Sequence, residues 1–350
     1  MGLSLNIISR YIERWLIVCL VLIPLVIQQS CKNDIEVFTE YKEQAIVYGL
    51  LDLSQETQYL KIQRTFLNPN STAHEIAQLK DSLYFEDASV KLIEEQTGKE
   101  IEFQRIDSIP KDSGFFQNST NYLYASNVLL DAKYTYRLLI KNNKTGYTAT
   151  GRTQIVRAPI VNFPVSINNP FFSVSPKLNV NLRFVNGLNA KSQDAYFEFT
   201  VAEFPESDTT QTTFKKIQWH FVTNLVNEGG APYMPGNRAT SVPGIGFYDF
   251  FLGNMDNGVF NTDKYVQRRI VRTDFVLISA SQDLADFVAA STPSIGIVQK
   301  QIDFSNVQNG LGIFSSRYTY RVNKVAIDPA IIGYFNSLDY KKYNVLRFIE

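Results

Sequence analysis

Cysteine and histidine are scarce in this sequence: the chain of 350 residues has two of each. Cys19 lies inside an apolar run near the N-terminus, which leaves Cys31 alone and excludes both a disulfide scaffold and a zinc site of paired thiolates. His74 begins a His-Glu-x-x sequence, but Gln78 stands where a zinc protease has its second histidine. His220 lies in a predicted strand, and no triad partner can be assigned to it. We therefore predict no metal site and no histidine-dependent hydrolase.

The chain also lacks an excess of either charge. Its 34 Lys and Arg residues balance its 34 Asp and Glu residues, so it has no electrostatic footprint for nucleic acid. No Gly-x-Ser-x-Gly sequence, Walker loop or dinucleotide fingerprint occurs. Catalysis by two carboxyl groups needs no such motif and remains open. Aromatic residues are abundant, with 25 Phe and 19 Tyr, and this favours strands over helices.

The N-terminus has the pattern of an export signal. Arg10 and Arg14 precede an uninterrupted apolar run of 13 residues, from Trp15 to Ile27. A membrane-spanning helix needs about 20 apolar residues, whereas the apolar part of a signal peptide needs only about 7–15. The run is therefore typical of a signal peptide. An uncleaved anchor helix and a plain secretory signal cleaved elsewhere are the alternatives.

A cysteine follows this run at the place expected for lipid attachment. Ser30 directly precedes Cys31, which resembles the lipobox of bacterial lipoproteins, although Gln28 stands where a small or aliphatic residue is usual. In such proteins the cysteine is acylated and becomes the first residue of the mature chain. We predict a lipoprotein signal peptide over residues 1–30, a lipid on Cys31 and a tether over residues 31–42. This predicts attachment to a membrane through acyl chains.

Residues 43–159 read as short alternating strands separated by turns. Two hairpins are predicted, with turns at residues 96–99 and 142–146. Leu130 precedes Tyr136 by six positions, which resembles the tyrosine corner of fibronectin type III domains. We predict a mainly β chain that begins with an immunoglobulin-like or fibronectin-III-like sandwich over these residues, with a short helical insertion after Thr72. An ordinary β-meander with a Tyr-rich strand is the alternative.

A second domain is expected after a proline-rich stretch. Four prolines between Pro159 and Pro176 predict a linker over residues 160–176, and residues 177–350 again read mostly as strands with short helices. Ile217, Trp219 and Phe221 alternate with polar residues and so share one face of a strand. A helix is expected to begin after Ser281.

The most informative part of the second domain is a long connection over residues 223–263. It is rich in glycine and carries a cluster of aromatic residues, and connections of this length are usually functional or disordered. We predict that its aromatic side chains form a partner-binding or ligand-binding loop. The alternative is that they fill the core of the second domain. The candidates are Tyr233, Phe247, Tyr248, Phe250, Phe251 and Phe260.

Taken in order, these features resemble a family of Bacteroidota lipoproteins described as domain of unknown function 4249. The lipobox cysteine, the end of the first β domain and a late stretch with Asn306, Gly310, Gly312 and Phe314 are similar to the family's pattern. The resemblance covers nearly the whole mature chain. It implies an envelope protein that is often encoded beside TonB-dependent outer-membrane transporters. It implies no activity and no catalytic residues.

The functional prediction is accordingly coarse. We expect a lipid-anchored outer-membrane protein, on either face of that membrane, that works by binding and is an accessory to a transporter or another envelope protein. We expect no cofactor, no catalytic residues and no nucleic-acid partner. The alternatives are an envelope glycan hydrolase with paired carboxylates and a structural surface protein. Two carboxyl groups roughly 5–9 Å apart in a cleft would favour the hydrolase.

Overall fold

The computed structural model describes residues 42–66, 75, 83–107, 109, 121–206, 209–255, 266–291 and 304–350. The fold is mainly β and is built on large sheets, which confirms the predicted class. Cys31, the predicted signal peptide and Phe260 lie outside the described residues, as does most of the helix expected after Thr72. Residues 42–350 form one compact unit, and both hydrophobic cores close within it, so a chain that starts at Lys42 is expected to fold by itself.

Seven strands enclose the first core. They are β1 (Ala45–Asp52), β2 (Thr57–Arg64), β3 (Ala88–Glu94), β4 (Glu100–Ile106), β5 (Leu123–Asn127), β6 (Thr135–Asn142) and β7 (Thr148–Gln154). Their order is β1-β2-β5-β4-β3-β6-β7, and all of these pairs are antiparallel. The β3–β4 and β6–β7 pairs confirm both predicted hairpins. Because β4 pairs with β5 along one part and with β3 along another, it connects the two layers around the core.

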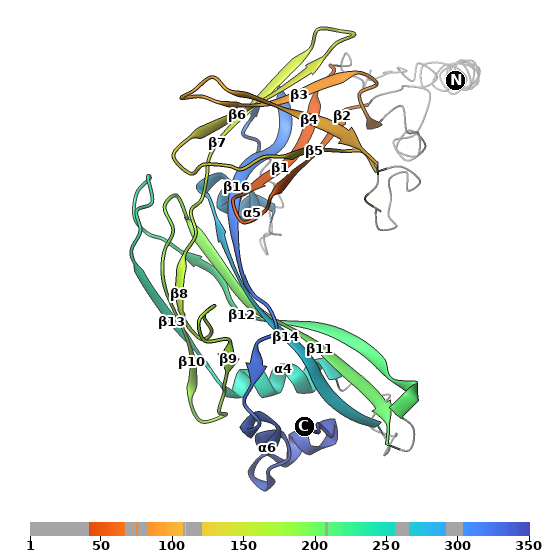
Figure 1. Ribbon diagram of the computed structural model, residues 1–350, viewed down its shortest axis with the longest axis vertical. Coiled ribbons are helices and arrows are strands. Elements are labelled where there is room, and N and C mark those ends of the chain that lie inside the picture. The colour runs from red at the N-terminus through yellow and green to blue at the C-terminus, as the bar shows by residue number, and fades with distance from the viewer. Residues whose placement is uncertain are drawn as a thin grey trace, which may run out of the picture. The chain divides into compact units, whose positions relative to one another are not determined.

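A segment from near the C-terminus completes this first core. β15 (Val307–Gln308) pairs with β7, and β16 (Gly310–Val322) runs parallel to β1, beside which it lies in Figure 1. Val307 and Phe314 are buried among the residues of the first core. Residues 307–317, which the sequence assigns to the second domain, therefore pack with the first.

The stretch from Asn306 to Phe314 has a structural role at this junction. The Asn306 side chain accepts a hydrogen bond from the Phe314 N–H (2.9 Å) and donates one to the Phe314 carbonyl oxygen (2.8 Å), which closes the turn between β15 and β16. Gly312 has φ +95°, and a Cβ there would stand 2.2 Å from the carbonyl oxygen of Val47. Only glycine fits this position, because the backbone is left-handed and the neighbouring strand is too close for a side chain.

The remaining strands enclose the second core. They are β8 (Ile160–Phe163), β9 (Phe171–Phe172), β10 (Asn179–Val185), β11 (Ser192–Pro205), β12 (Thr213–Val226), β13 (Asn237–Pro243), β14 (Val266–Ala280) and β17 (Ala326–Ile327). Strands β12-β11-β14-β16 continue the large sheet, β13-β10-β8 form a small sheet, and β9 pairs with β17. β8 and β9 lie within the predicted linker, where Val161, Val165 and Phe172 are buried in the second core.

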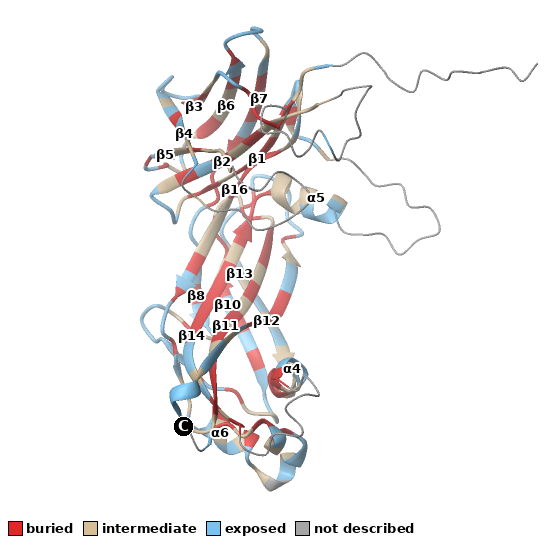
Figure 2. Ribbon diagram, turned by 90° about the vertical axis from the view of Figure 1, so that its right-hand side faces the viewer, coloured by how far each residue is buried: buried red, intermediate tan, exposed pale blue. Residues whose placement is uncertain are grey.

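The described residues also form short helices. They are α4 (Ile245–Met255), α5 (Gln282–Ser291) and α6 (Ala330–Phe335), with 3₁₀ segments η1 (Thr209–Gln211) and η3 (Leu338–Leu346). α4, α6 and η3 pack on the second core, whereas α5 has no buried residue and lies beside β16. The helix predicted after Ser281 is confirmed. Figure 2 shows the alternation of buried and exposed residues along the strands, which is the pattern that the sequence predicts. Ile217, Trp219 and Phe221 are buried on one face of β12, as expected.

Candidate functional site

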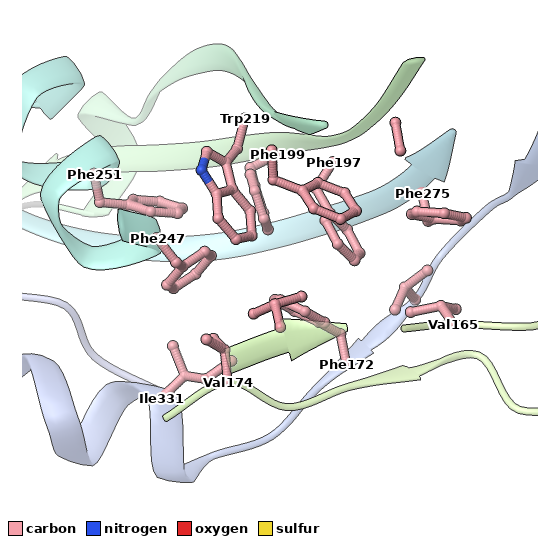
Figure 3. Packing of buried hydrophobic residues seen from close by; sticks show 14 of the residues in the cluster. Val165, Phe172, Val174, Phe197, Phe199, Trp219, Phe247, Phe251, Phe275 and Ile331 are labelled. Atoms are coloured by element: carbon pink, nitrogen blue, oxygen red, sulfur yellow. The ribbon is translucent and has the colours of Figure 1, made fainter. Parts of the chain in front are cut away.

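The predicted aromatic binding loop is largely part of the core. Residues 223–263 contain the end of β12, all of β13 and α4. Phe247, Tyr248 and Phe251 on α4 are completely buried, so the prediction that they form an exposed binding surface is wrong. The Phe247 ring lies 5.3 Å from the Trp219 ring and 5.7 Å from the Phe199 ring (Figure 3). The helix is apolar on most sides, and the surrounding strands cover it.

The other candidates of that loop have different positions. Phe250 is only partly buried and packs against the second core. Tyr233 is buried, its hydroxyl donates to the side-chain oxygen of Gln282, and the Lys191 ammonium lies 5.0 Å from its ring centre. Tyr233 also lines a cavity of about 300 Å³ between the two cores. Of the predicted loop residues that the structure describes, Tyr233 is the one found in the wall of a cavity.

This smaller cavity contains a perturbed carboxyl group. Asp283, in the first turn of α5, lies at its wall, and burial raises the pKa of this carboxyl above its ordinary value. The side-chain amide of Asn306 donates a hydrogen bond to it at 3.0 Å, which partly offsets that effect. At about 300 Å³ this cavity is at the lower limit of typical ligand sites, so it is less suited to a ligand than the larger one described next.

A larger cavity of about 540 Å³ lies at one end of the first core, and we call it the end cavity. Its wall is formed by Glu43, Arg64, Tyr84, Phe85, Glu86, Arg105, Tyr122, Asn142, Lys144 and Thr145. These residues come from the starts of β1, β3 and β5, the ends of β2 and β4, and the β6–β7 turn. In an antiparallel sheet the start of one strand lies beside the end of the next, so strand pairing brings all of them to one end. No sequence motif signals this site.

Aromatic rings and a guanidinium group form a packed cluster in the end cavity. The Arg105 guanidinium lies 4.7 Å from the centre of the Tyr122 ring, and Tyr84 meets the same ring edge-on at 5.1 Å. One Arg105 nitrogen also donates to the carbonyl oxygens of Phe85 (3.4 Å) and Glu86 (3.2 Å). These contacts hold the guanidinium in place. Burial raises the pKa of the Tyr84 phenol, so its hydroxyl stays protonated and can donate a hydrogen bond.

The charged groups of the end cavity are of mixed sign. Glu43 accepts hydrogen bonds from the side chains of Asn142 (2.8 Å) and Thr145 (2.7 Å), and Glu86 pairs with Lys144. The cavity thus combines aromatic faces with carboxylate, amide and guanidinium groups. Such a set suits a ligand with hydroxyl or amide groups and flat apolar faces, such as a glycan or a peptide.

The class that the fold and the cavities define is a mainly β protein with two hydrophobic cores and a polar, aromatic-lined cavity at one end. The scan against protein-family models and the search of curated proteins both give no match. In the described part of the chain, no three His, Cys, Asp or Glu side chains are grouped to hold a metal ion. Among the same residues, no helix combines the length and the apolarity needed to cross a bilayer.

Proposed function

We propose that the chain is a lipid-anchored outer-membrane protein that binds a ligand or partner protein through the end cavity. The observation that carries the binding role is the clustering of Arg105, Tyr122 and Tyr84 in that cavity. The location rests on the signal-like N-terminus and Cys31, together with the family resemblance, which suggests a TonB-dependent transporter as partner. Glu43 lines the cavity one residue after the predicted tether ends, so a ligand held there would lie next to the end of that tether.

The proposal extends to the fold of the first core. We propose that the first core is an immunoglobulin-like sandwich, with β1, β2 and β5 as strands A, B and E and with β4, β3, β6 and β7 as strands C′, C, F and G. Two observations support it. The strand order has β1-β2-β5 in one layer and β4-β3-β6-β7 in the other. The Asp131 N–H donates to the Tyr136 hydroxyl at 2.9 Å, as a tyrosine corner requires at the start of strand F.

The location is tested by following Cys31 in cells. We expect palmitate to label the wild-type chain, and globomycin to block its processing. Cys31→Ala should remove the label and release the protein from the membrane fraction. A Cys31→Ala protein that still sediments with outer membranes would contradict the lipid anchor but would leave the binding role untouched.

The binding role is tested with two variants in the end cavity. The full chain, with an affinity tag, is extracted in mild detergent after cross-linking, and the proteins recovered with it, TonB-dependent transporters among them, are identified by mass spectrometry. We expect Arg105→Ala and Tyr122→Ala to lose the cross-linked partner. Tyr59→Ala is the matched control, because Tyr59 is an exposed tyrosine on β2 outside the cavity wall. Equal recovery from all four proteins would contradict binding through the cavity.

A glycan hydrolase is the second candidate, because Glu43 and Glu86 line the same cavity. A glycosidase needs two carboxyl groups roughly 5–9 Å apart across the sugar. Here both carboxylates already have partners within the chain, which suits binding better than proton transfer. We expect the wild-type protein to release no reducing ends from envelope glycans. Release that disappears in both Glu43→Gln and Glu86→Gln would establish the hydrolase instead.

A further inference from the structure

A long stretch of the chain contains basic residues and no acidic ones. Residues 132–193 include nine Lys and Arg residues but no Asp or Glu, although the whole chain has 34 of each charge. The stretch contains β8, β9 and β10, at one side of the second core. In this part of it, Arg157, Lys177 and Arg183 are exposed. Residues 157–185, which contain these three strands, thus carry three basic residues and no acidic one.

Large apolar side chains are exposed along the same stretch. Ile160, Phe163, Ile167, Phe171 and Leu178 expose between 42% and 68% of their surface, and we call these five residues the apolar edge. Single exposed apolar residues are common on soluble proteins, but five within 19 residues are not scattered singly. An exposed apolar cluster of this kind marks a site of contact with another protein or with a membrane.

The five residues follow one another along the chain from β8 to the start of β10. Phe163 is paired with Arg183, near the end of β10, whereas Leu178 directly precedes the start of β10. The edge thus extends along about seven residues of β10, or roughly 23 Å at about 3.3 Å per residue. Figure 1 shows β8 and β9 one after the other beside β10.

A partner that adds a strand fits this edge poorly. In the described part of the chain, β8 pairs only with β10, which leaves its other side open. However, β8 has only four residues and is followed by Pro164, which has no N–H to donate. Short edge strands and proline are devices that prevent strand addition. A binding partner therefore contacts the side chains of this edge rather than its backbone N–H and C=O groups.

Cations and apolar groups are interleaved along the edge. The Arg183 guanidinium lies 5.6 Å from the centre of the Phe163 ring, so a positive charge stands directly over an exposed aromatic side chain. The acidic side chain of Asp328 accepts a hydrogen bond from Ser173, within the same stretch, at 2.6 Å. Long cationic side chains beside Phe, Ile and Leu are typical of surfaces that meet the headgroup region of a bilayer.

We propose that the apolar edge binds the surface of an anionic lipid bilayer. Phe163, Ile167 and their neighbours enter the boundary between headgroups and acyl chains, and Arg157, Lys177 and Arg183 contact lipid phosphates. Anionic lipid is complementary to this edge, because the edge is positive and carries almost no acidic side chain. This inference does not depend on acylation of Cys31, because the contact is made by the folded unit itself.

Vesicle sedimentation tests the apolar part of the proposal. A chain starting at Lys42, which lacks the predicted anchor, is mixed with vesicles of phosphatidylcholine with or without phosphatidylglycerol. We expect binding to the vesicles that contain phosphatidylglycerol, and a loss of about tenfold or more in the double variant Phe163→Ser/Ile167→Ser. Phe214→Ser is the matched control, because Phe214 is 67% exposed on β12, in the other sheet. It should bind as the wild type does.

Charge reversal tests the electrostatic part. We expect Arg157→Glu/Lys177→Glu to reduce binding to phosphatidylglycerol vesicles by about thirtyfold or more, since the two basic residues together contribute about 2 kcal/mol near such a surface. Lys216→Glu, at an exposed position on β12, is the control and should have little effect. Circular dichroism checks that each variant is folded. A wild-type chain that binds no anionic vesicle, or folded edge variants that bind as tightly as it does, would overturn the proposal.

Discussion

Phe314 lies against Gly151, although the two residues are far apart in the sequence. A Cβ built on Gly151 would stand 2.7 Å from the Cβ of Phe314, closer than such atoms approach. On the other side, a Cβ on Gly49 would stand 3.1 Å from the Phe314 ring. The completely buried ring is therefore held between β1 and β7 at positions where neither strand has room for a side chain. The first core depends on a residue from the C-terminal part of the chain.

The first prediction concerns this ring. Phe314→Ala should lower the free energy of unfolding by about 3–5 kcal/mol, because truncating a buried Phe leaves a cavity. Gly151→Val should also destabilise, by overpacking of about 1–3 kcal/mol. Gly333→Ala on α6 is the control, because a Cβ there meets no atom within 4 Å. Urea unfolding followed by far-ultraviolet circular dichroism measures all three.

The same packing predicts the behaviour of a truncated chain. A fragment of residues 43–159 lacks β15, β16 and Phe314, so it should be less stable than the same core in the longer chain. A fragment that unfolds at the same urea concentration as the first core of the whole chain would show that the C-terminal segment adds nothing. This outcome would also restore the domain boundary predicted from the sequence.

The second prediction concerns Tyr136, whose hydroxyl accepts a hydrogen bond from the Asp131 N–H and donates one to Glu94 at 3.4 Å. Tyr136→Phe should cost about 1–3 kcal/mol, because a buried donor and acceptor lose their partner. Burial raises the pKa of the Tyr136 phenol to about 12. Its contribution is therefore complete below about pH 10 and is lost as the pH rises towards 12, since the unfolded phenol gives up its proton first.

This pH dependence separates the hydrogen bond from simple packing. The stability of the wild type should fall more steeply above about pH 10 than that of Tyr136→Phe, which has no phenol at this position. Tyr59→Phe, at an exposed tyrosine on β2, serves as the control and should follow the wild type. Parallel stability curves for wild type and Tyr136→Phe in alkaline solution would argue against the tyrosine-corner contact.

Local features of this fold could be predicted from the sequence. Alternation of apolar and polar residues identified the buried face of β12 with Ile217, Trp219 and Phe221, and turn residues identified both hairpins. These signals lie within a few residues of each other along the chain. The pairing of β1 with β16 joins Ala45 to Gly310 in parallel and leaves no local pattern. The stretch from Asn306 to Phe314 stood out in the sequence, but its role in this pairing could not be predicted.

The candidate site was harder to predict than the fold. The aromatic residues of α4 stood out because of their composition, yet a helix that is apolar on most sides is buried. Arg105, Tyr122 and Tyr84 stood in no motif, because each adjoins or lies in a different strand and they meet only when the strands pair. A site assembled from strand ends has no fixed spacing in the sequence, and for this reason the end cavity could not be predicted.

The third prediction concerns the pH dependence that Asp274 confers. Burial by itself would raise the pKa of this carboxyl, but hydrogen bonds from Arg272 (2.8–3.0 Å) and from the Lys324 N–H (2.9 Å) outweigh it and lower the pKa. Because the pKa is lowered, the carboxylate adds stability that is present at pH values above its ordinary pKa of 3.8. This stability is lost as the pH falls through the folded-state pKa. Asp274→Asn should therefore destabilise at neutral pH, by about 1.5–3 kcal/mol, and much less in acid.

The control for Asp274 is an exposed acidic residue. Glu100 pairs with Lys91 at 2.8 Å on the surface of β3 and β4, and Glu100→Gln should cost at most about 1 kcal/mol at neutral pH. Chemical unfolding at neutral and acidic pH measures both variants. The account of Asp274 fails if the difference between wild type and Asp274→Asn is the same at both pH values.

The last prediction concerns the buried ion pair of Arg268 and Glu203, whose Nε–Oε1 distance is 2.7 Å. Arg268 also donates to the Leu346 carbonyl oxygen at 2.9 Å, so the pair holds the C-terminal segment against β14. Glu203→Gln leaves a buried guanidinium without its counter-charge and should cost about 3–5 kcal/mol. The double variant Glu203→Leu/Arg268→Met removes both charges and should cost less than the two single variants together.

Hydrogen exchange distinguishes this local role from a general loss of stability. Because Arg268 also pairs through its backbone with Arg347 and Ile349, Glu203→Gln should speed exchange first in η3 and the residues that follow it. The exposed pair of Lys342 and Asp249, at 2.7 Å, is the matched control. Asp249→Asn should cost at most about 1 kcal/mol, since solvent screens exposed charges. Uniformly faster exchange in both cores of Glu203→Gln would show instead that the pair stabilises the whole unit and not the C-terminal segment in particular.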